Sequence, residues 1–110
     1  MPELTTTLLE IGEVAELYNL LGRAFYKKGN YKQAMEAFLR ATELNPASAI
    51  DYANIGVNYE KMGRVDEAVK FYKIALDLDP HIDFAKNNYL HNFSNSFLAN
   101  LAAPIAGFFM

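Results

Sequence analysis

The sequence predicts an all-α protein built from repeated two-helix units. Three observations lead to this fold class. The sequence repeats itself at a fixed interval, the one that separates Gly22 from Gly56. Apolar residues in each repeat follow the three-and-four spacing of amphipathic helices, and Gly and Pro interrupt that spacing at fixed positions.

The internal repeat is visible when the sequence is shifted against itself by this interval. Aromatic and branched residues then also fall over similar ones, such as Phe38 over Tyr72. So many matches in one register indicate a duplicated structural unit. The identical pairs are Tyr18 with Tyr52, Gly22 with Gly56, Lys27 with Lys61, Gly29 with Gly63, Ala34 with Ala68, Ala41 with Ala75, Leu44 with Leu78 and Pro46 with Pro80.

Repeat 1 is predicted to span residues 15–48. Ala15 to Lys28 has helical apolar spacing, and Gly29 ends it because glycine adopts the left-handed conformation that closes a helix at little steric cost. Tyr31 to Leu44 resumes the helical pattern. It stops before Pro46, because the residue preceding a proline avoids the helical region.

Repeat 2 follows the same order over residues 49–82. A helix from Ile50 to Met62 ends at Gly63, and a second helix from Val65 to Leu78 ends before Pro80. Small residues at equivalent positions of both repeats are expected to let the paired helices approach closely while aromatic rings fill the remaining space.

Residues 1–14 form the predicted N-terminal helical extension. Leu4, Leu8, Ile11 and Val14 have helical spacing, so the segment is either a separate cap or a backward continuation of the first repeat helix.

The repeat resembles the tetratricopeptide repeat (TPR), whose pattern places an aromatic, Leu-Gly, Tyr, Ala, Phe, Ala and Pro at fixed offsets within a unit of about 34 residues. The resemblance covers Ala15 to about Ile82, with Tyr18 and Tyr52 where the family most often has Trp. It implies antiparallel helix pairs stacked into a right-handed superhelix, an α-α solenoid whose concave face binds peptides.

Residues 83–110 read as a degenerate third repeat with a capping helix and an apolar tail, so that 1–110 forms a single domain. Leu90 stands where the earlier repeats have Gly, and Phe97 stands where a Gly would end the helix. The pattern therefore predicts one long terminal helix from Ile82 to about Ala103, with no second helix returning over it.

The tail carries no charged residue after Lys86, and its apolar pattern continues beyond what two repeats can cover. Either the next elements are missing and the chain is a fragment, or the tail folds back, or it mediates self-association as a homodimer or oligomer. A membrane-surface role is less favoured because the tail lacks Lys and Arg. The residues assigned to self-association are Phe93, Phe97, Leu98, Leu101, Ile105 and Phe108.

Side chains that point away from the partner helix are expected to line the concave face. Two of them, Asn54 and Asn88, lie one repeat interval apart and resemble the asparagine ladder of some TPR superhelices. An amide both donates and accepts, so it can pair with a peptide backbone; Asn facing solvent without a partner is the alternative. The predicted peptide-binding residues are Asn19, Arg23, Tyr26, Lys27, Asn54, Val57, Lys61, Phe84, Asn87, Asn88 and His91.

A related subclass binds the C-terminal carboxylate of chaperones through a clamp of Lys, Asn and Arg residues. Only Asn54 fits that pattern, since Asn19, Arg23, Phe84 and Asn88 are the wrong types at the other four positions. We therefore do not expect this subclass, although Arg23 and the lysines of the face can meet an acidic stretch of another ligand.

Composition excludes several other functions. A net charge of −3 offers no basic surface for nucleic acid, and the absence of cysteine removes thiol chemistry and disulfides. No pattern suggests a catalytic residue, a metal site or a cofactor, and no run of apolar residues is long enough for a transmembrane helix. The N-terminus lacks a secretory pattern, so a cytoplasmic location is expected.

Two hypotheses of function follow. The first is a non-enzymatic module that binds a protein or peptide segment in the concave groove. The alternative is a structural protein that assembles through its uncharged C-terminal helix.

Overall fold

The computed structural model describes the backbone of residues 2–96 and the side chains from residue 7 onward. Every regular element in this part of the chain is an α-helix. The helices are α1 (Pro2–Lys27), α2 (Tyr31–Leu44), α3 (Ala49–Lys61), α4 (Val65–Leu78) and α5 (Asp83–Asn95).

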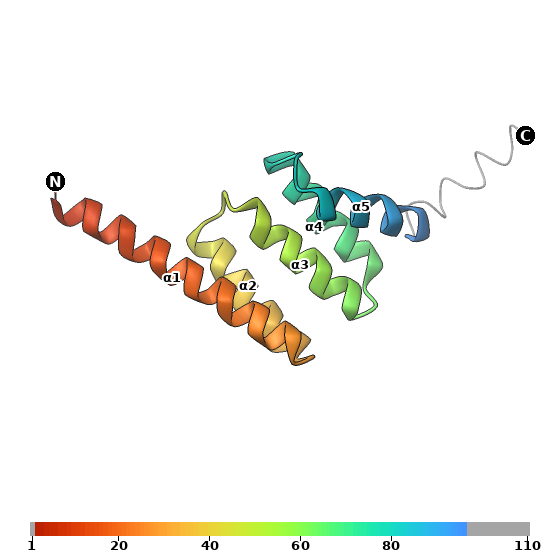
Figure 1. Ribbon diagram of the computed structural model, residues 1–110, viewed down its shortest axis with the longest axis horizontal. Coiled ribbons are helices and arrows are strands. Elements are labelled where there is room, and N and C mark those ends of the chain that lie inside the picture. Colours follow the sequence, from red (N-terminus) through yellow and green to blue (C-terminus); the bar gives the residue numbers. More distant parts are fainter. Residues whose placement is uncertain (1, 97–110) are drawn as a thin grey trace, which may run out of the picture.

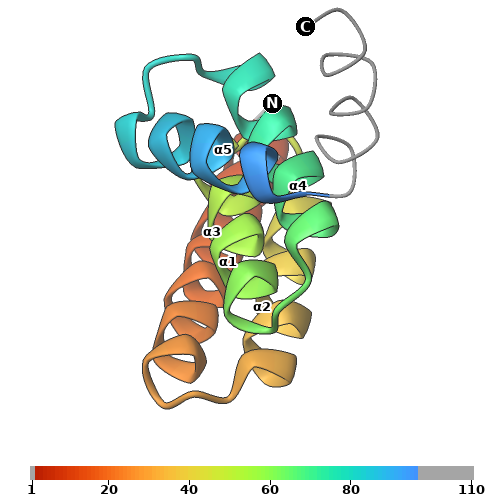
Figure 2. The ribbon, with the colours of Figure 1, turned by 90° about the vertical axis from the view of Figure 1, so that its right-hand side faces the viewer.

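The helices form two antiparallel hairpins followed by a fifth helix (Figure 1). α1 packs against α2 and α3 against α4, while α2 also contacts α3 and α4 also contacts α5. Viewed end-on, α1 and α3 lie on one side of the array and α2 and α4 on the other (Figure 2). This is the predicted solenoid of helix pairs.

The first helix of each hairpin ends in the same way. Gly29 and Gly63 have φ values of 80° and 78°, in the left-handed region that favours glycine. Asn30 N–H donates to the carbonyl of Phe25 at 2.9 Å, and Arg64 N–H donates equivalently to that of Tyr59 at 2.9 Å. These bonds satisfy carbonyls that the helix leaves open at its end, as a Schellman motif does.

The core of each hairpin is a glycine that faces an aromatic ring. A Cβ added to Gly22 would lie 2.6 Å from ring atoms of Phe38, and one added to Gly56 would lie 2.8 Å from the ring of Tyr72. Both rings are buried, and alanines of α2 and α4 fill the space around them. The predicted size complementarity between small and large residues is therefore present in both repeats.

α1 continues without interruption from Pro2 to Lys27, so the N-terminal extension prolongs the first repeat helix. The first half of α1 projects beyond α2 (Figure 1).

α5 is shorter than predicted. The expectation of one unbroken helix from Ile82 to about Ala103 is wrong, because α5 ends at Asn95 and Ser96 has extended backbone angles of φ −84° and ψ 163°. Ser96 Oγ donates to the carbonyl of Phe93 at 2.9 Å, and Asn95 Nδ2 donates to that of His91 at 3.1 Å. Side chains that bond nearby backbone carbonyls compete with helix continuation.

A polar cluster attaches α5 to α3 and α4. Tyr72 Oη donates to Glu60 Oε1 at 3.1 Å and accepts from Asn88 Nδ2 at 3.2 Å, and Asn92 Nδ2 also donates to Glu60. Burial raises the pKa of Tyr72 above its ordinary value, so the hydroxyl keeps the proton that it donates.

None of the helices in the described part of the chain combines the length and the apolar character that crossing a bilayer requires.

The close approach of glycine and ring predicts a stability change. Gly22→Ala or Gly56→Ala should lower the free energy of unfolding by up to about 2 kcal/mol, because overpacking costs about 1–3 kcal/mol and offsets a gain of about 1 kcal/mol in helix propensity. Urea denaturation followed by circular dichroism measures the change.

Gly12→Ala is the matched control, because nothing lies within 4 Å of a Cβ at this position of α1. It should raise the free energy of unfolding by about 0.5–1 kcal/mol. If Gly22→Ala stabilised the protein as Gly12→Ala does, the close approach would be refuted.

Candidate functional site

A groove runs between α1 and α3 on the side of the array that α5 borders. It consists of two hollows. The larger hollow, about 470 Å³ in volume, is lined by Gly12, Ala15, Glu16, Asn19, Arg23, Asn45, Ser48, Ile50, Asp51, Asn54 and Phe84.

The smaller hollow, about 200 Å³ in volume, is lined mainly by apolar atoms. Arg23 and Asn54 border both hollows, so the two form one continuous groove. The residues lining the smaller hollow are Arg23, Tyr26, Lys27, Phe38, Asn54 and Val57.

Helical spacing explains why these side chains converge. Asn19, Arg23 and Tyr26 recur at intervals of four and three on α1, and so do Ile50, Asn54 and Val57 on α3. Residues at these intervals share one face of a helix. Because α1 and α3 occupy equivalent positions in adjacent hairpins, their two faces border the same groove.

A buried hydrogen bond fixes α1 to α3 beside the larger hollow. Asn19 Nδ2 donates to Asp51 Oδ1, and both residues are nearly inaccessible, at 6% and 4% exposure. Asp51 lies in the first turn of α3, where the helix dipole favours a negative charge. Asn19 therefore positions the helices and has this amide donor engaged within the protein.

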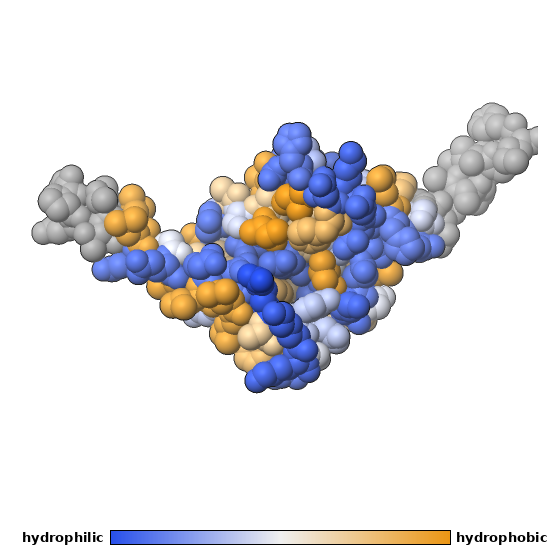
Figure 3. All heavy atoms as spheres, in the orientation of Figure 1, coloured by the Kyte–Doolittle hydropathy of each residue, from blue (hydrophilic) through white to orange (hydrophobic). Residues whose placement is uncertain are grey.

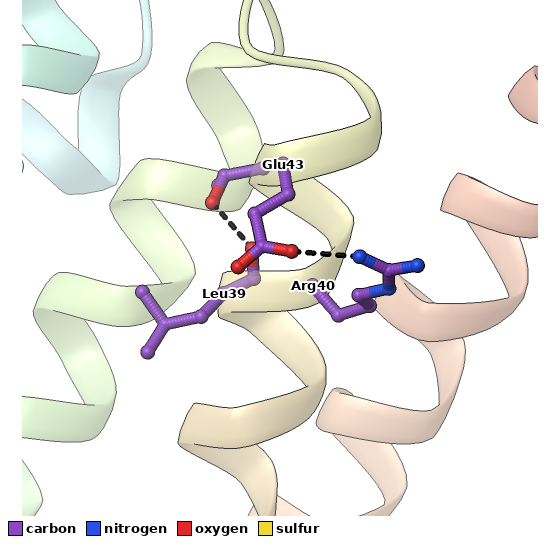
Figure 4. Close-up of polar contacts among 4 residues, drawn as sticks. Leu39, Arg40 and Glu43 are labelled. Carbon is purple, nitrogen blue, oxygen red and sulfur yellow. Dashed lines mark hydrogen bonds and ion pairs between the residues drawn. The ribbon is translucent and has the colours of Figure 1, made fainter.

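The cations of the groove have no ion-pair partner among the described residues. The ion pairs in this part of the chain lie on or beside α2 and α4, and each joins residues one turn apart: Arg40 with Glu43 (Figure 4), Arg64 with Glu67, and Lys73 with Asp77. Arg23 and Lys27 belong to none of them, so their charges are available to a ligand.

Apolar surface lies beside these charges. Tyr26, Phe38 and Val57 line the smaller hollow, and Ile50 and Phe84 border the larger one, with 45% and 38% of their surface exposed. The groove can therefore take an apolar side chain next to a negatively charged one.

Seven of the eleven predicted binding residues line the two hollows. They are Asn19, Arg23, Tyr26, Lys27, Asn54, Val57 and Phe84.

The other four, Lys61, Asn87, Asn88 and His91, line neither hollow. Asn88 Nδ2 donates to Tyr72 Oη at 3.2 Å, so the row of asparagines that begins at Asn54 stays a prediction.

The sequence did not predict several of the residues that line the groove. Asn45 and Ser48 lie in the connection between hairpins, where the sequence signals only the end of one helix and the start of another. Phe38 fits the packing pattern, and Asp51 fits a helix start. No local pattern distinguishes these residues from others of their kind, because the groove brings them together from separate segments.

The residues predicted for self-association fall mostly outside the described part of the chain. Phe93 is 39% exposed and stacks on Tyr89 with ring centroids 5.9 Å apart. Phe97, Leu98, Leu101, Ile105 and Phe108 lie beyond the described residues, so assembly through the tail stays a prediction.

The array matches known protein families along its repeats. A family model described as TPR repeat matches residues 22–63, and one described as tetratricopeptide repeat matches residues 49–82. The chain belongs to the tetratricopeptide repeat family. Together the two matches cover residues 22–82, from the last turns of α1 to just beyond the end of α4.

Similar curated proteins are much longer than this chain. A TPR repeat-containing protein of Methanocaldococcus jannaschii is 28% identical over 88% of the chain and 18% of its own length. The protein O-mannosyl-transferase TMTC3 of Homo sapiens is 33% identical over 79% of the chain and 10% of its own length. The chain therefore spans less than a fifth of the length of either protein.

Two solved TPR structures have the same arrangement of helices. The second TPR of Spaghetti (RPAP3), bound to the HSP90 peptide SRMEEVD, superposes with a TM-score of 0.74, at 28% identity and 82% coverage of both chains. A crystal structure of MamA also gives a TM-score of 0.74, at 27% identity, covering 84% of this chain and 54% of that one.

The bond between Asn19 and Asp51 predicts a stability effect inside the groove. Asn19→Ala should lower the free energy of unfolding by about 1–3 kcal/mol, because it leaves a buried carboxylate without this donor. Urea denaturation measures the change, and Asn87→Ala, at an exposed position of α5, should stay within about 0.5 kcal/mol of the parent protein. Equal effects of the two substitutions would contradict the role given to Asn19.

Proposed function

We propose that the protein binds a segment of another protein in the groove between α1 and α3 and performs no covalent chemistry. The segment presents an acidic side chain next to an apolar one. The observation that carries this proposal is the pairing of two free cations, Arg23 and Lys27, with the apolar smaller hollow that they border.

The acidic preference follows from local electrostatics. The chain as a whole is negatively charged, so general attraction does not bring an acidic ligand to it. The preference arises where Arg23 and Lys27 lie together without a carboxylate partner among the described residues. A carboxylate placed there gains charge-assisted hydrogen bonds, while the neighbouring apolar side chain is removed from water in the smaller hollow.

Asn54 is the central polar contact of this proposal. Its side chain borders both hollows, so a segment that occupies the whole groove must pass it. An amide offers both donors and an acceptor, which allows it to pair with peptide backbone without demanding a particular side chain. Asn54 thus contributes affinity, and the cations contribute selectivity.

The neighbouring structure supports a peptide as the ligand. The second TPR of RPAP3 holds a peptide that contains two glutamates and shares the fold of this chain. This chain nevertheless lacks most of the residues of the carboxylate clamp. We therefore propose recognition of acidic side chains within a segment, without a requirement for a free C-terminal carboxylate.

Charge selectivity is the first test. Synthetic peptides with an amidated C-terminus and one apolar residue flanked by Glu, Ser or Lys should bind in the order Glu, Ser, Lys by fluorescence anisotropy. Arg23→Glu combined with Lys27→Glu should weaken binding of the Glu peptide by about tenfold or more and should favour the Lys peptide.

Lys70→Glu, on the exposed surface of α4, makes a matched change of charge away from the groove and should leave the order unchanged. Equal binding of the Glu and Lys peptides would rule out the acidic preference.

The role of Asn54 is tested with a natural partner that this protein captures in a pull-down from the source organism. Asn54→Ala should weaken binding several-fold without changing the helical circular dichroism signal, because the side chain lies at the groove and is partly exposed to solvent. Unchanged affinity, measured by calorimetry, would place the binding site elsewhere.

A further inference from the structure

α1 carries a continuous apolar stripe on the side turned away from the groove. Ile11, Val14, Tyr18, Leu21 and Phe25 follow one another at intervals of three, four, three and four residues. This is the heptad spacing with which one helix packs along another. The stripe therefore has the pattern of a helix-to-helix interface.

α2 partly covers Tyr18 and Phe25 of this stripe, whereas no helix in the described part of the chain buries Ile11, Val14 and Leu21. Ile11, Val14 and Leu21 are 38%, 41% and 45% exposed, although each is a large apolar side chain. Ile11 and Val14 lie in the first half of α1, which projects alone beyond α2 (Figure 1). Hydrophobic residues are visible along α1 in the space-filling view (Figure 3). Exposed apolar surface of this extent marks an interface.

The second half of the stripe borders a hollow of its own. Tyr18, Leu21 and Phe25 of α1, together with Gln33, Glu36 and Ala37 of α2, line a mostly apolar hollow of about 220 Å³. It lies at the outer edge of the first hairpin, on a different face of α1 from the groove residues Asn19 and Arg23. A helix lying along the stripe would fill this hollow and leave the groove open.

The charges of α1 identify the helix that fits. Glu10 and Glu13 lie near the start of the stripe region, whereas Lys28 lies at its end, and none of the three lines the peptide groove. None of them belongs to the ion pairs found among the described residues. An antiparallel copy of α1 would place acidic residues beside basic ones, and a parallel copy would place like charges together.

We infer that two copies of this chain form a dimer through an antiparallel pairing of their α1 helices. The projecting half of each α1 covers the edge hollow of the other copy, so the same surface serves both partners across a twofold axis. Glu10 and Lys28 are separated by about five helical turns and so flank the stripe on the same side of α1. Across the pair, Glu10 of one copy lies toward Lys28 of the other.

This dimer does not depend on the proposed peptide groove, because the stripe and the groove occupy different faces of α1. Peptide binding can fail while the dimer persists, and the dimer can fail while the groove still binds. The two proposals are thus separately testable.

Sedimentation equilibrium of the full chain over a wide range of concentration tests the dimer. We expect a reversible dimer, and Ile11→Glu combined with Val14→Glu should weaken its association by about tenfold or more. Both positions lie in the projecting part of α1, so the helical signal should persist. Leu9→Glu is the matched control: Leu9 is 65% exposed on the opposite side of the same segment and should not affect association.

A charge exchange tests the antiparallel orientation. Glu10→Lys and Lys28→Glu should each weaken the dimer several-fold, and the two substitutions together should restore it. A chain that stays monomeric at every concentration would overturn the proposal, as would a dimer unaffected by Ile11→Glu with Val14→Glu. A dimer that the double charge exchange fails to restore would overturn the antiparallel pairing.

Discussion

The contact between a glycine and an aromatic ring inside each hairpin is the constraint on which the rest of the structure depends. Gly22 lets Phe38 lie against the backbone of α1, and Gly56 does the same for Tyr72 against α3. Because the same contact recurs at the repeat interval, the two hairpins have the same spacing and present equivalent faces. The groove exists because two such faces adjoin.

Hydrogen bonds between hairpins set how those faces are aligned. Asn19 of α1 bonds to Asp51 of α3, Asn58 of α3 donates to the carbonyl of Tyr31 at the start of α2 at 2.8 Å, and Asn92 of α5 donates to Glu60 of α3. Apolar packing is not directional, so it tolerates small rotations between units. Buried polar groups require their partners, so the bond between Asn19 and Asp51 sets the spacing of α1 and α3 at the groove, and the other two attach α3 to α2 and α5.

The helices were predictable because their signals are local. Apolar spacing and the Gly and Pro positions place α2, α3, α4 and the end of α1 within about a residue. They left the start of α1 open, and Ser96 ends α5 through a bond that helix spacing does not reveal. Seven of the eleven residues predicted from helical phase line the two hollows. Asn88 lines neither hollow and donates one amide hydrogen to Tyr72, whereas Asn45 and Ser48, which were not predicted, reach the groove from a loop. Whether these residues line the groove depends on distances between segments that are far apart in the sequence.

The first and last helices of the array, α1 and α5, differ in the kind of helix that can pack against them. Leu90 of α5 stands where Gly22 and Gly56 stand in the hairpins, and it is 58% exposed. Even a Cβ at those glycines would collide with the aromatic ring of the partner helix. The larger side chain of Leu90 therefore prevents a helix like α2 or α4 from packing its ring against the backbone of α5. Stacking α5 of one copy on α1 of the next would leave both ends open and extend without limit, whereas pairing through α1 closes on itself. The dimer proposed through the stripe on α1 is of this closed kind.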